Sequence, residues 1–353
     1  MAYTDIDDPT IYFSTTLYTG DGQQNRAVTI DGTGMQPDWL WVKNRSAAEG
    51  HVVGDSVRGA TKRLIPNAAD EEATRPTNIA SFTSTGFTVA NGGVDGAVNT
   101  NNATYVSWAW KAGTSFTNDA SSTSVGSIDS AGSFNNDAGF SIFTFTGTGS
   151  VGTIKHGLNT KPDVIIIKGR SDAKAWTIYH NFLGAGSAVF LQATDAAVDH
   201  DRYWNDVEPT TSVFTAGSST NLSGNGITFV GYAFTAKQGY SKFGFYKGND
   251  NANGSYVYTG FKPRWIMIKR TNSVNDFLIL DTKRNPINPS NERILANTSA
   301  AGNTSNIMID FLSNGFKARS TYGGINGDGD SFIYFAFAES PFVTSTGIPA
   351  TAR

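Results

Sequence analysis

The sequence predicts an all-β protein of three tandem antiparallel units, each a β-sandwich or barrel-like repeat of about 100 residues. Three observations support this fold class. Gly, Ser, Thr, Asn and aromatic residues are abundant while only 16% of residues are charged, a composition typical of short strands joined by tight turns. No sustained apolar pattern of helical period is present. In addition, one set of landmarks occurs three times along the chain.

The first landmark is an anchor strand, in which a proline is followed by a strongly β-forming run that ends in lysine. Its three copies are Pro37–Lys43, Pro162–Lys168 and Pro263–Lys269. An aromatic residue and a glycine turn precede each anchor, and the glycine lies 17, 15 and 15 residues before the proline. This nearly constant spacing predicts a hairpin arm that leads into the anchor strand.

The second landmark is a closing strand, whose central aromatic residue lies 71, 70 and 72 residues after the anchor proline. These central residues are Trp108, Tyr232 and Phe335. Alternate residues of a strand point to opposite faces. In the third copy one face carries Phe332, Tyr334 and Ala336, and the other carries Ile333, Phe335 and Phe337. Because both faces are apolar, we expect a central strand that is buried on both sides.

The landmarks divide the chain into six segments. These are an N-terminal arm (1–11), repeat 1 (12–113), a linker or arm (114–139), repeat 2 (140–239), repeat 3 (240–342) and a C-terminal tail (343–353). The segment 114–139 is polar and contains no Lys or Arg, which favours an extended arm. We expect the polar chain ends to become ordered only through contacts with neighbouring molecules.

Charge and cysteine content exclude several classes of protein. Lys and Arg number 27 against 30 Asp and Glu, so a nucleic-acid partner is disfavoured. The chain has no cysteine and therefore no disulfide or thiolate metal site. No apolar run reaches 18 residues and the N-terminus has no signal-peptide pattern, so we expect synthesis in the cytoplasm without membrane insertion.

Catalytic and cofactor motifs are absent from the sequence. There is no nucleophile elbow and no phosphate loop, and the histidines lack the spacing of metal ligands. We therefore predict no enzyme activity, no catalytic residues, no metal and no cofactor. Asp55 with Arg58, and Asp281 with Arg284, are interpreted as local salt bridges that order a turn.

Basic residues at the end of each anchor strand are the candidate ligand-binding residues. They are Lys43, Arg45, Lys168, Arg170, Lys269 and Arg270. Solvated strand ends explain them most simply. Alternatively, an outward-facing cationic edge binds an anionic glycan or the phosphates of lipopolysaccharide.

One loop is a weak candidate for a cation site. Asn326, Asp328 and Asp330 alternate as the first ligands of a calcium loop do, but Ser331 and Phe337 stand where the motif requires Gly and Glu. A hairpin turn is the preferred interpretation.

Six stretches together resemble a repeat protein frequent in the genomes of marine tailed bacteriophages. They are Leu17–Gly20, Pro37–Lys43, Asp55–Leu64, Tyr105–Gly113, Gly239–Gly244 and Phe311–Phe316. The resemblance covers nearly the whole chain and implies a virion structural role, commonly labelled tail fibre or receptor-binding. It supplies no catalytic residues.

Three functions follow, in decreasing order of preference. The first is a tail-associated, fibre-like adhesin that contacts the host surface, the second a capsid-decorating or other structural virion protein, and the third a polysaccharide-degrading tail enzyme. The expected partners are further copies of the chain in a homotrimer, other virion proteins, and a host surface glycan or lipopolysaccharide. The expected location is the tail or capsid surface of the virion.

Overall fold

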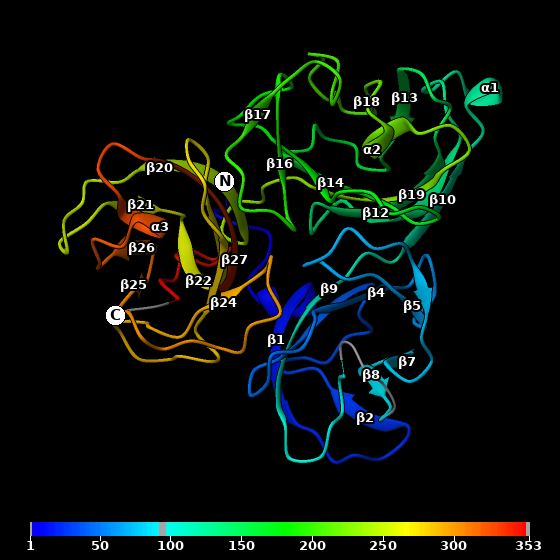
Figure 1. The fold of residues 1–353 in the computed structure, drawn as a ribbon. Coiled ribbons are helices and arrows are strands. Elements are labelled where there is room, and N and C mark those ends of the chain that lie inside the picture. The colour runs from blue at the N-terminus through cyan, green and yellow to red at the C-terminus, as the bar shows by residue number, and fades with distance from the viewer. Residues whose placement is uncertain (1, 92–96, 351–353) are drawn as a thin grey trace.

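The computed structural model describes residues 2–91 and 97–350. Strands account for 42% of the chain and helices for 4%, so the predicted all-β class is confirmed. Neighbouring strands within the sheets run antiparallel. Figure 1 shows three lobes around a common centre: a blue-to-cyan lobe, a green lobe, and a yellow-to-red lobe.

Each lobe contains one large sheet. In the first it comprises β1 (Phe13–Thr19), β9 (Thr104–Trp110), β3 (Trp39–Asn44) and β4 (Val52–Asp55). In the second it comprises β10 (Thr114–Asn118), β11 (Ser130–Asn135), β12 (Phe140–Thr146), β19 (Thr228–Phe234), β14 (Val164–Gly169), β15 (Thr177–His180), β16 (Ser187–Phe190) and β17 (Val198–Asp199). In the third it comprises β20 (Ser241–Lys247), β27 (Ser331–Pro341), β22 (Phe261–Arg270), β23 (Phe277–Asp281) and β24 (Ile294–Leu295).

A small sheet faces each large one. The small sheets are β2 (Arg26–Thr29), β8 (Gly86–Val89) and β7 (Ile79–Thr83); β13 (Gly152–Lys155) and β18 (Val213–Ala216); and β21 (Tyr256–Tyr258), β26 (Gly315–Ala318) and β25 (Ile309–Leu312). Strands β5 (Lys62–Arg63) and β6 (Ala73–Thr74) form a separate pair. The helices are η1 (Pro9–Ile11), α1 (Ala120–Thr123), α2 (Thr220–Ser223) and α3 (Gly323–Asn326). All described sheets are open, with distinct edge strands, so the lobes are sandwiches.

The closing strands β9, β19 and β27 lie between two neighbours in their sheets, as the sequence predicts. Their central residues Trp108, Tyr232 and Phe335 are buried. In β27, Phe332, Tyr334 and Ala336 join the core between the two sheets of the third lobe, and Ile333, Phe335 and Phe337 join a different core. The prediction of two apolar, buried faces is therefore confirmed.

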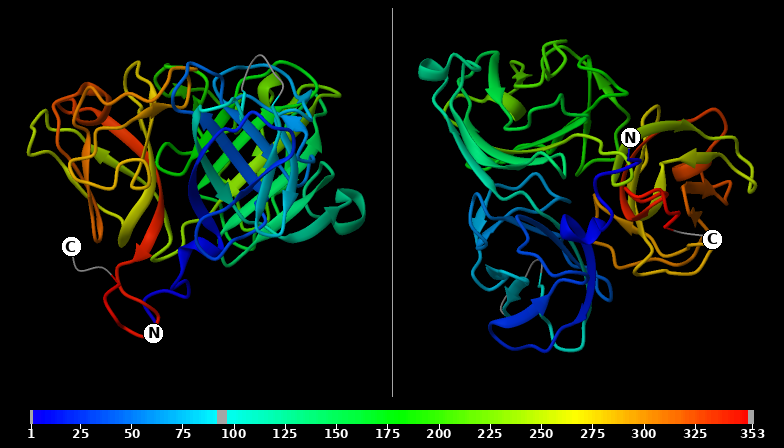
Figure 2. Two further views of the ribbon diagram at one scale, coloured as in Figure 1. Left: turned by 90° about the horizontal axis from the view of Figure 1, so that it is seen from below. Right: turned by 180° about the vertical axis from the view of Figure 1, so that it is seen from behind.

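That second core is shared by all three lobes. The outer face of each large sheet contributes to it, so the sheets pack around one centre (Figure 2). Its middle is an aromatic cluster made by one closing-strand residue from each lobe. Trp110, Phe234 and Phe337 contact one another with ring centroids 5.5 to 6.5 Å apart. Burial of this much apolar surface holds the lobes together without disulfides.

Glycine is required directly after β1, β12 and β20. A Cβ on Gly20 would lie 2.0 Å from the Thr100 carbonyl oxygen, and one on Gly248 would lie 2.2 Å from that of Gly327. A Cβ on Gly147 would lie 2.4 Å from the Gly224 carbonyl oxygen. The hairpin connections predicted at these glycines therefore depend on a close backbone approach that excludes any side chain.

The segment 114–139, predicted to be a linker or arm, adds two strands to the second lobe. Strand β11 pairs with β12, and β10 pairs with β11. Helix α1 lies between β10 and β11, and Asp119 caps it by accepting a hydrogen bond from the Ser122 backbone. The large sheet of the second lobe is therefore extended by a hairpin that precedes its first predicted strand.

The N-terminal segment packs against its own chain. Ile6 is buried in the shared core, the Tyr3 hydroxyl donates to the Gly260 carbonyl at 2.7 Å, and Thr4 donates to Gln238 at 2.7 Å. Asp7 accepts hydrogen bonds from Ser345 in the C-terminal tail. For the described residues Tyr3–Asp7 and Ser345, the expectation that the chain ends are ordered only by neighbouring molecules is wrong, because other parts of the same chain supply the contacts.

Candidate functional site

The three predicted lysines lie at the ends of the anchor strands, but they are fully buried. Lys43, Lys168 and Lys269 all have 0% exposure, so the prediction that they face outward is wrong. The reason is that a loop of the neighbouring lobe covers each of them. The sequence of an anchor strand does not indicate which loop of another lobe lies against its lysine.

Each buried ammonium group bonds to backbone carbonyls of its own lobe and of the adjacent one. Across the junctions, Lys43 Nζ donates to Ser299 at 3.1 Å, Lys168 Nζ to Ala69 at 3.0 Å, and Lys269 Nζ to Thr194 at 2.8 Å. Burial lowers the pKa of each lysine to about 8. These lysines therefore hold loops of different lobes together and present no cationic surface.

The three candidate arginines are partly exposed, and each is paired with a carboxylate. Arg45 pairs with Glu292 at 3.0 Å, Arg170 with Glu72 at 2.9 Å, and Arg270 with Asp330 at 2.6 Å. The first two pairs join different lobes. The six predicted residues therefore lie at three separate junctions and do not converge on one site.

The weak cation candidate is engaged in protein contacts. The buried Asn326 amide donates to Asn249, Asn251 and Ser320 at 2.8 to 3.0 Å. Asp330 is paired with Arg270. Within residues 2–91 and 97–350, no group of three His, Cys, Asp or Glu side chains could hold a metal ion. Asn326 ends helix α3, and the turn that follows it leads into β27, so the loop is a turn between a helix and a strand and not the hairpin turn predicted from the sequence.

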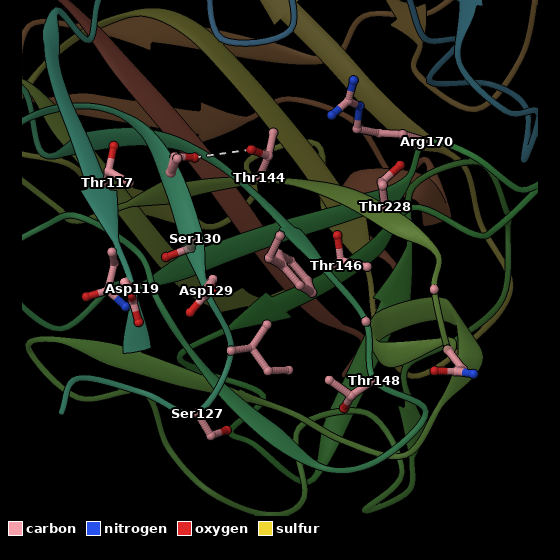
Figure 3. A pocket seen from close by; sticks show the side chains of 17 residues that line it. Thr117, Asp119, Ser127, Asp129, Ser130, Thr144, Thr146, Thr148, Arg170 and Thr228 are labelled. Carbon is pink, nitrogen blue, oxygen red and sulfur yellow. Dashed lines mark hydrogen bonds between the residues drawn. The ribbon is translucent and has the colours of Figure 1, made fainter. Parts of the chain in front are cut away.

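A groove with a volume of about 810 Å³ lies elsewhere, on the second lobe (Figure 3). Its lining is rich in hydroxyl groups, with two carboxylates and one guanidinium group. The lining polar residues drawn and labelled are Thr117, Asp119, Ser127, Asp129, Ser130, Thr144, Thr146, Thr148, Arg170 and Thr228. This volume is in the usual range for small-ligand sites.

The hairpin formed by 114–135 builds one wall of this groove. Thr117 on β10, Ala131 on β11 and Thr144 on β12 are neighbours across the paired strands, so they share one face. The Asp129 carboxylate accepts a hydrogen bond from the Ala120 backbone at 2.8 Å, which positions the turn at the groove rim. The equivalent sheets of the other two lobes begin at β1 and β20 and have no such hairpin.

The groove offers hydrogen bonds of both kinds. Ser and Thr hydroxyls donate and accept, the carboxylates accept, and Arg170 donates. Hydrogen bonds from Ser121 and Ser122 lower the pKa of Asp119, which keeps this exposed carboxyl ionised at neutral pH. An ionised carboxylate accepts hydrogen bonds from a ligand but cannot protonate a leaving group.

Of the groove residues, Arg170 alone was predicted as a binding residue. The signal that could have found the others is the composition of 114–139, which is rich in Ser, Thr, Asn and Asp. That composition is equally typical of a linker. Only strand pairing with β12 distinguishes the two possibilities.

In the part of the chain that the structure describes, no helix is long and apolar enough to cross a membrane. A protein-family model described as "Domain of unknown function (DUF7483)" matches residues 8–341. No curated protein matches the sequence.

Proposed function

This chain belongs to the family described as Domain of unknown function (DUF7483), and from that starting point we propose that it is a non-enzymatic, glycan-binding protein of a tailed bacteriophage virion. The polar groove of the second lobe carries this proposal. In this role the groove binds a host surface polysaccharide, and the protein acts as a tail-associated adhesin. The virion setting rests on the resemblance to marine phage repeat proteins.

The groove stands out because the rest of the molecule is a repeated scaffold. We infer three copies of one unit from the recurring strand order and from contacts that recur at equivalent positions. One side-chain amide per lobe accepts the backbone N–H fourteen residues after the anchor proline: Asn67 from His51 at 2.8 Å, Gln192 from Trp176 at 2.9 Å, and Asn297 from Phe277 at 3.0 Å. A feature that only one copy has is therefore the best candidate for a specific function.

A polyhydroxylated ligand fits the groove chemistry. Sugar hydroxyls donate and accept hydrogen bonds, as do the Ser and Thr side chains of the lining. Asp119, Asp129 and Arg170 add charged partners, which form stronger hydrogen bonds than neutral ones. The lining also includes the side chains of Ile128 and Phe145, and such a mixed, open surface suits a glycan chain, because sugar rings have both polar and apolar faces.

Binding is favoured over cleavage. Glycoside hydrolysis needs a carboxylic acid that stays protonated until it reaches the leaving group, which requires a raised pKa. The pKa of Asp119 is instead lowered. The polysaccharide-degrading enzyme therefore stays the least favoured alternative, and the capsid-decorating protein stays second.

The homotrimer expected from the sequence is also a proposal. The three lobes of one chain already enclose the shared aromatic core, so its contacts are made within a single molecule. A trimer of whole chains would have to form through other surfaces.

A binding measurement with a blocked groove tests the adhesin proposal. Thr146 is exposed in the groove on β12, so Thr146→Trp fills it with a bulky ring. Thr19 lies at the equivalent exposed position of β1, which makes Thr19→Trp a matched control. On an array of bacterial surface polysaccharides we expect saturable binding, weakened at least about tenfold by Thr146→Trp and unchanged by Thr19→Trp.

Two results would count against the proposal. Equal binding by both variants would mean that the groove is not the site. Release of new reducing ends from the bound polysaccharide would favour the enzyme alternative instead. Circular dichroism of both variants establishes that the fold is retained.

A further inference from the structure

Strand β20 is an edge strand of the third lobe, and no strand of the described chain pairs with its outer side. That side is engaged at its two ends, where Ser241 exchanges backbone hydrogen bonds with Lys237 and the Lys247 carbonyl accepts from the Ser255 hydroxyl, so the open stretch lies around Phe243 and Phe245. It occupies the same place as β12 in the second lobe. Both run antiparallel to the closing strand, with Phe243 opposite Phe335 in one lobe and Ile142 opposite Tyr232 in the other. In the second lobe, β11 fills the outer side of β12. The chain thus contains its own example of a strand added at this edge.

Two exposed aromatic rings lie beside the open edge. Phe182, from the second lobe, is 57% exposed and Phe245, on β20, is 39% exposed. Their rings stack with centroids 6.1 Å apart and planes 12° from parallel. In the second lobe the residue at the place of Phe245 is Thr144, which lies opposite Ala131 of β11. Exposed, mutually packed apolar side chains of this kind mark interaction surfaces.

The positive charge on β20 favours a partner strand that carries an acidic residue. Lys247 is exposed and, two residues from Phe245, lies on the same face of β20. A lysine on an edge strand opposes pairing with an identical edge, because two like charges would meet. An incoming strand with a carboxylate near Lys247 would instead form an ion pair.

We propose that β20 binds an extended strand of another protein by antiparallel β-augmentation. The strand carries an acidic residue opposite Lys247 and covers the rings of Phe182 and Phe245. Backbone hydrogen bonds to Phe243 and Phe245, between the engaged ends of β20, supply affinity, and these two side-chain contacts supply specificity. This surface is separate from the groove and does not depend on glycan binding.

The chain itself contains a suitable probe. Strand β11 pairs Ser130 with Phe145 and Ala131 with Thr144, so the next pair in this register is Asp129 with Thr146. Lys247 stands at the place of Thr146 in β20. A labelled peptide of residues 127–136, aligned in the same register on β20, would therefore place Asp129 opposite Lys247.

Fluorescence anisotropy with the full chain measures this binding. We expect saturable binding that Lys247→Glu weakens about two- to fivefold, the range for an exposed charge pair. A peptide with Asp129→Lys should bind better to the Lys247→Glu protein than to the original chain. Phe182→Ser combined with Phe245→Ser should weaken binding further. Thr19→Glu, at the matching position of β1, is the control and should have no effect.

Several outcomes would overturn the proposal. One is no binding at peptide concentrations up to about 1 mM. Another is equal affinity for the original chain, the Lys247→Glu variant and the double serine variant, which would place the peptide elsewhere. A dimer in analytical ultracentrifugation that Phe245→Ser abolishes would assign the edge to a second copy of the chain.

Discussion

The Tyr232 hydroxyl of the second lobe donates a hydrogen bond of 2.7 Å to the Asp55 carboxylate of the first. Asp55 is also paired with Arg58 at 2.5 Å, and both side chains are fully buried. Arg58 in turn contacts Glu72 at 3.0 Å, which pairs with Arg170 of the second lobe. The local salt bridge predicted from the sequence is therefore confirmed, and it is part of a network between lobes.

The same relationship recurs around the ring of lobes. The Trp108 indole of the first lobe donates to Asp281 of the third at 3.2 Å, and the His180 ring of the second lobe meets Phe335 of the third edge-on at 5.3 Å. Each lobe thus contacts another through the last residue of the strand that follows its anchor strand (Asp55, His180 or Asp281) and the other lobe's central closing-strand residue. This cyclic pattern closes the three units into one body.

Tyr232→Phe should destabilise the chain by about 1 to 3 kcal/mol, because it removes a donor from a buried carboxylate. Urea denaturation measures the change. Tyr334→Phe is the matched control: Tyr334 is also buried, but none of the described residues hydrogen-bonds its hydroxyl. An equal loss in the two variants would show that the Asp55 contact contributes nothing specific.

Phe335→Ala should cost about 3 to 5 kcal/mol, since it leaves a cavity in the shared core. Because that core joins all three lobes, we expect one unfolding transition shifted as a whole. Near-ultraviolet circular dichroism and calorimetry of the same samples check this. Two separate transitions would mean that the lobes unfold independently.

Lys168→Glu should destabilise the chain by more than about 3 kcal/mol, because it places a carboxylate among the carbonyl oxygens that now accept from Lys168. Lys247→Glu, at an exposed site, should change the free energy of unfolding by less than about 0.5 kcal/mol. Thermal denaturation compares the two variants. Similar stabilities would contradict the role of Lys168 in holding loops of two lobes together.

Acid should destabilise the protein through its buried histidines. Burial lowers the pKa of His180 to about 4 and that of His51 to about 3, from 6.5 in an unperturbed ring. Between about pH 6.5 and 4 the unfolded chain binds protons that the folded chain does not. The free energy of unfolding should therefore fall as pH is lowered, by about 1.4 kcal/mol per pH unit for each histidine.

Urea titrations from pH 7 to pH 4.5 test this dependence. His180→Gln should have a shallower slope, by one proton, than the original chain. Identical slopes in the two proteins would show that His180 is protonated equally in the folded and unfolded chain.

The local sequence pattern was sufficient to predict much of the fold. Alternation in β27 correctly assigned Phe332 and Phe335 to opposite buried faces, because strand geometry alone sets side-chain direction. The glycine before each anchor marked a turn because no Cβ fits there. The spacing of these landmarks located the strands but not what each strand faces beyond its own sheet.

The residues of the candidate site were harder to predict from the sequence. Lys168 ends a strand, and a strand end is ordinarily solvated, so its sequence environment favoured exposure. Its burial depends on a carbonyl of Ala69, which lies in another lobe. Likewise, the polar segment 114–139 becomes a groove wall only because β11 pairs with β12 along the edge that faces away from β19.

The sequence by itself determined the all-β class, the positions of the anchor and closing strands, and the apolar faces of the closing strands. These depend on residues close together in the chain. Tertiary structure alone decided which lysines are buried, where the groove forms and which strand edge stays open. Those properties depend on which lobe lies next to which, and that is set by packing of Trp110, Phe234 and Phe337 around one centre.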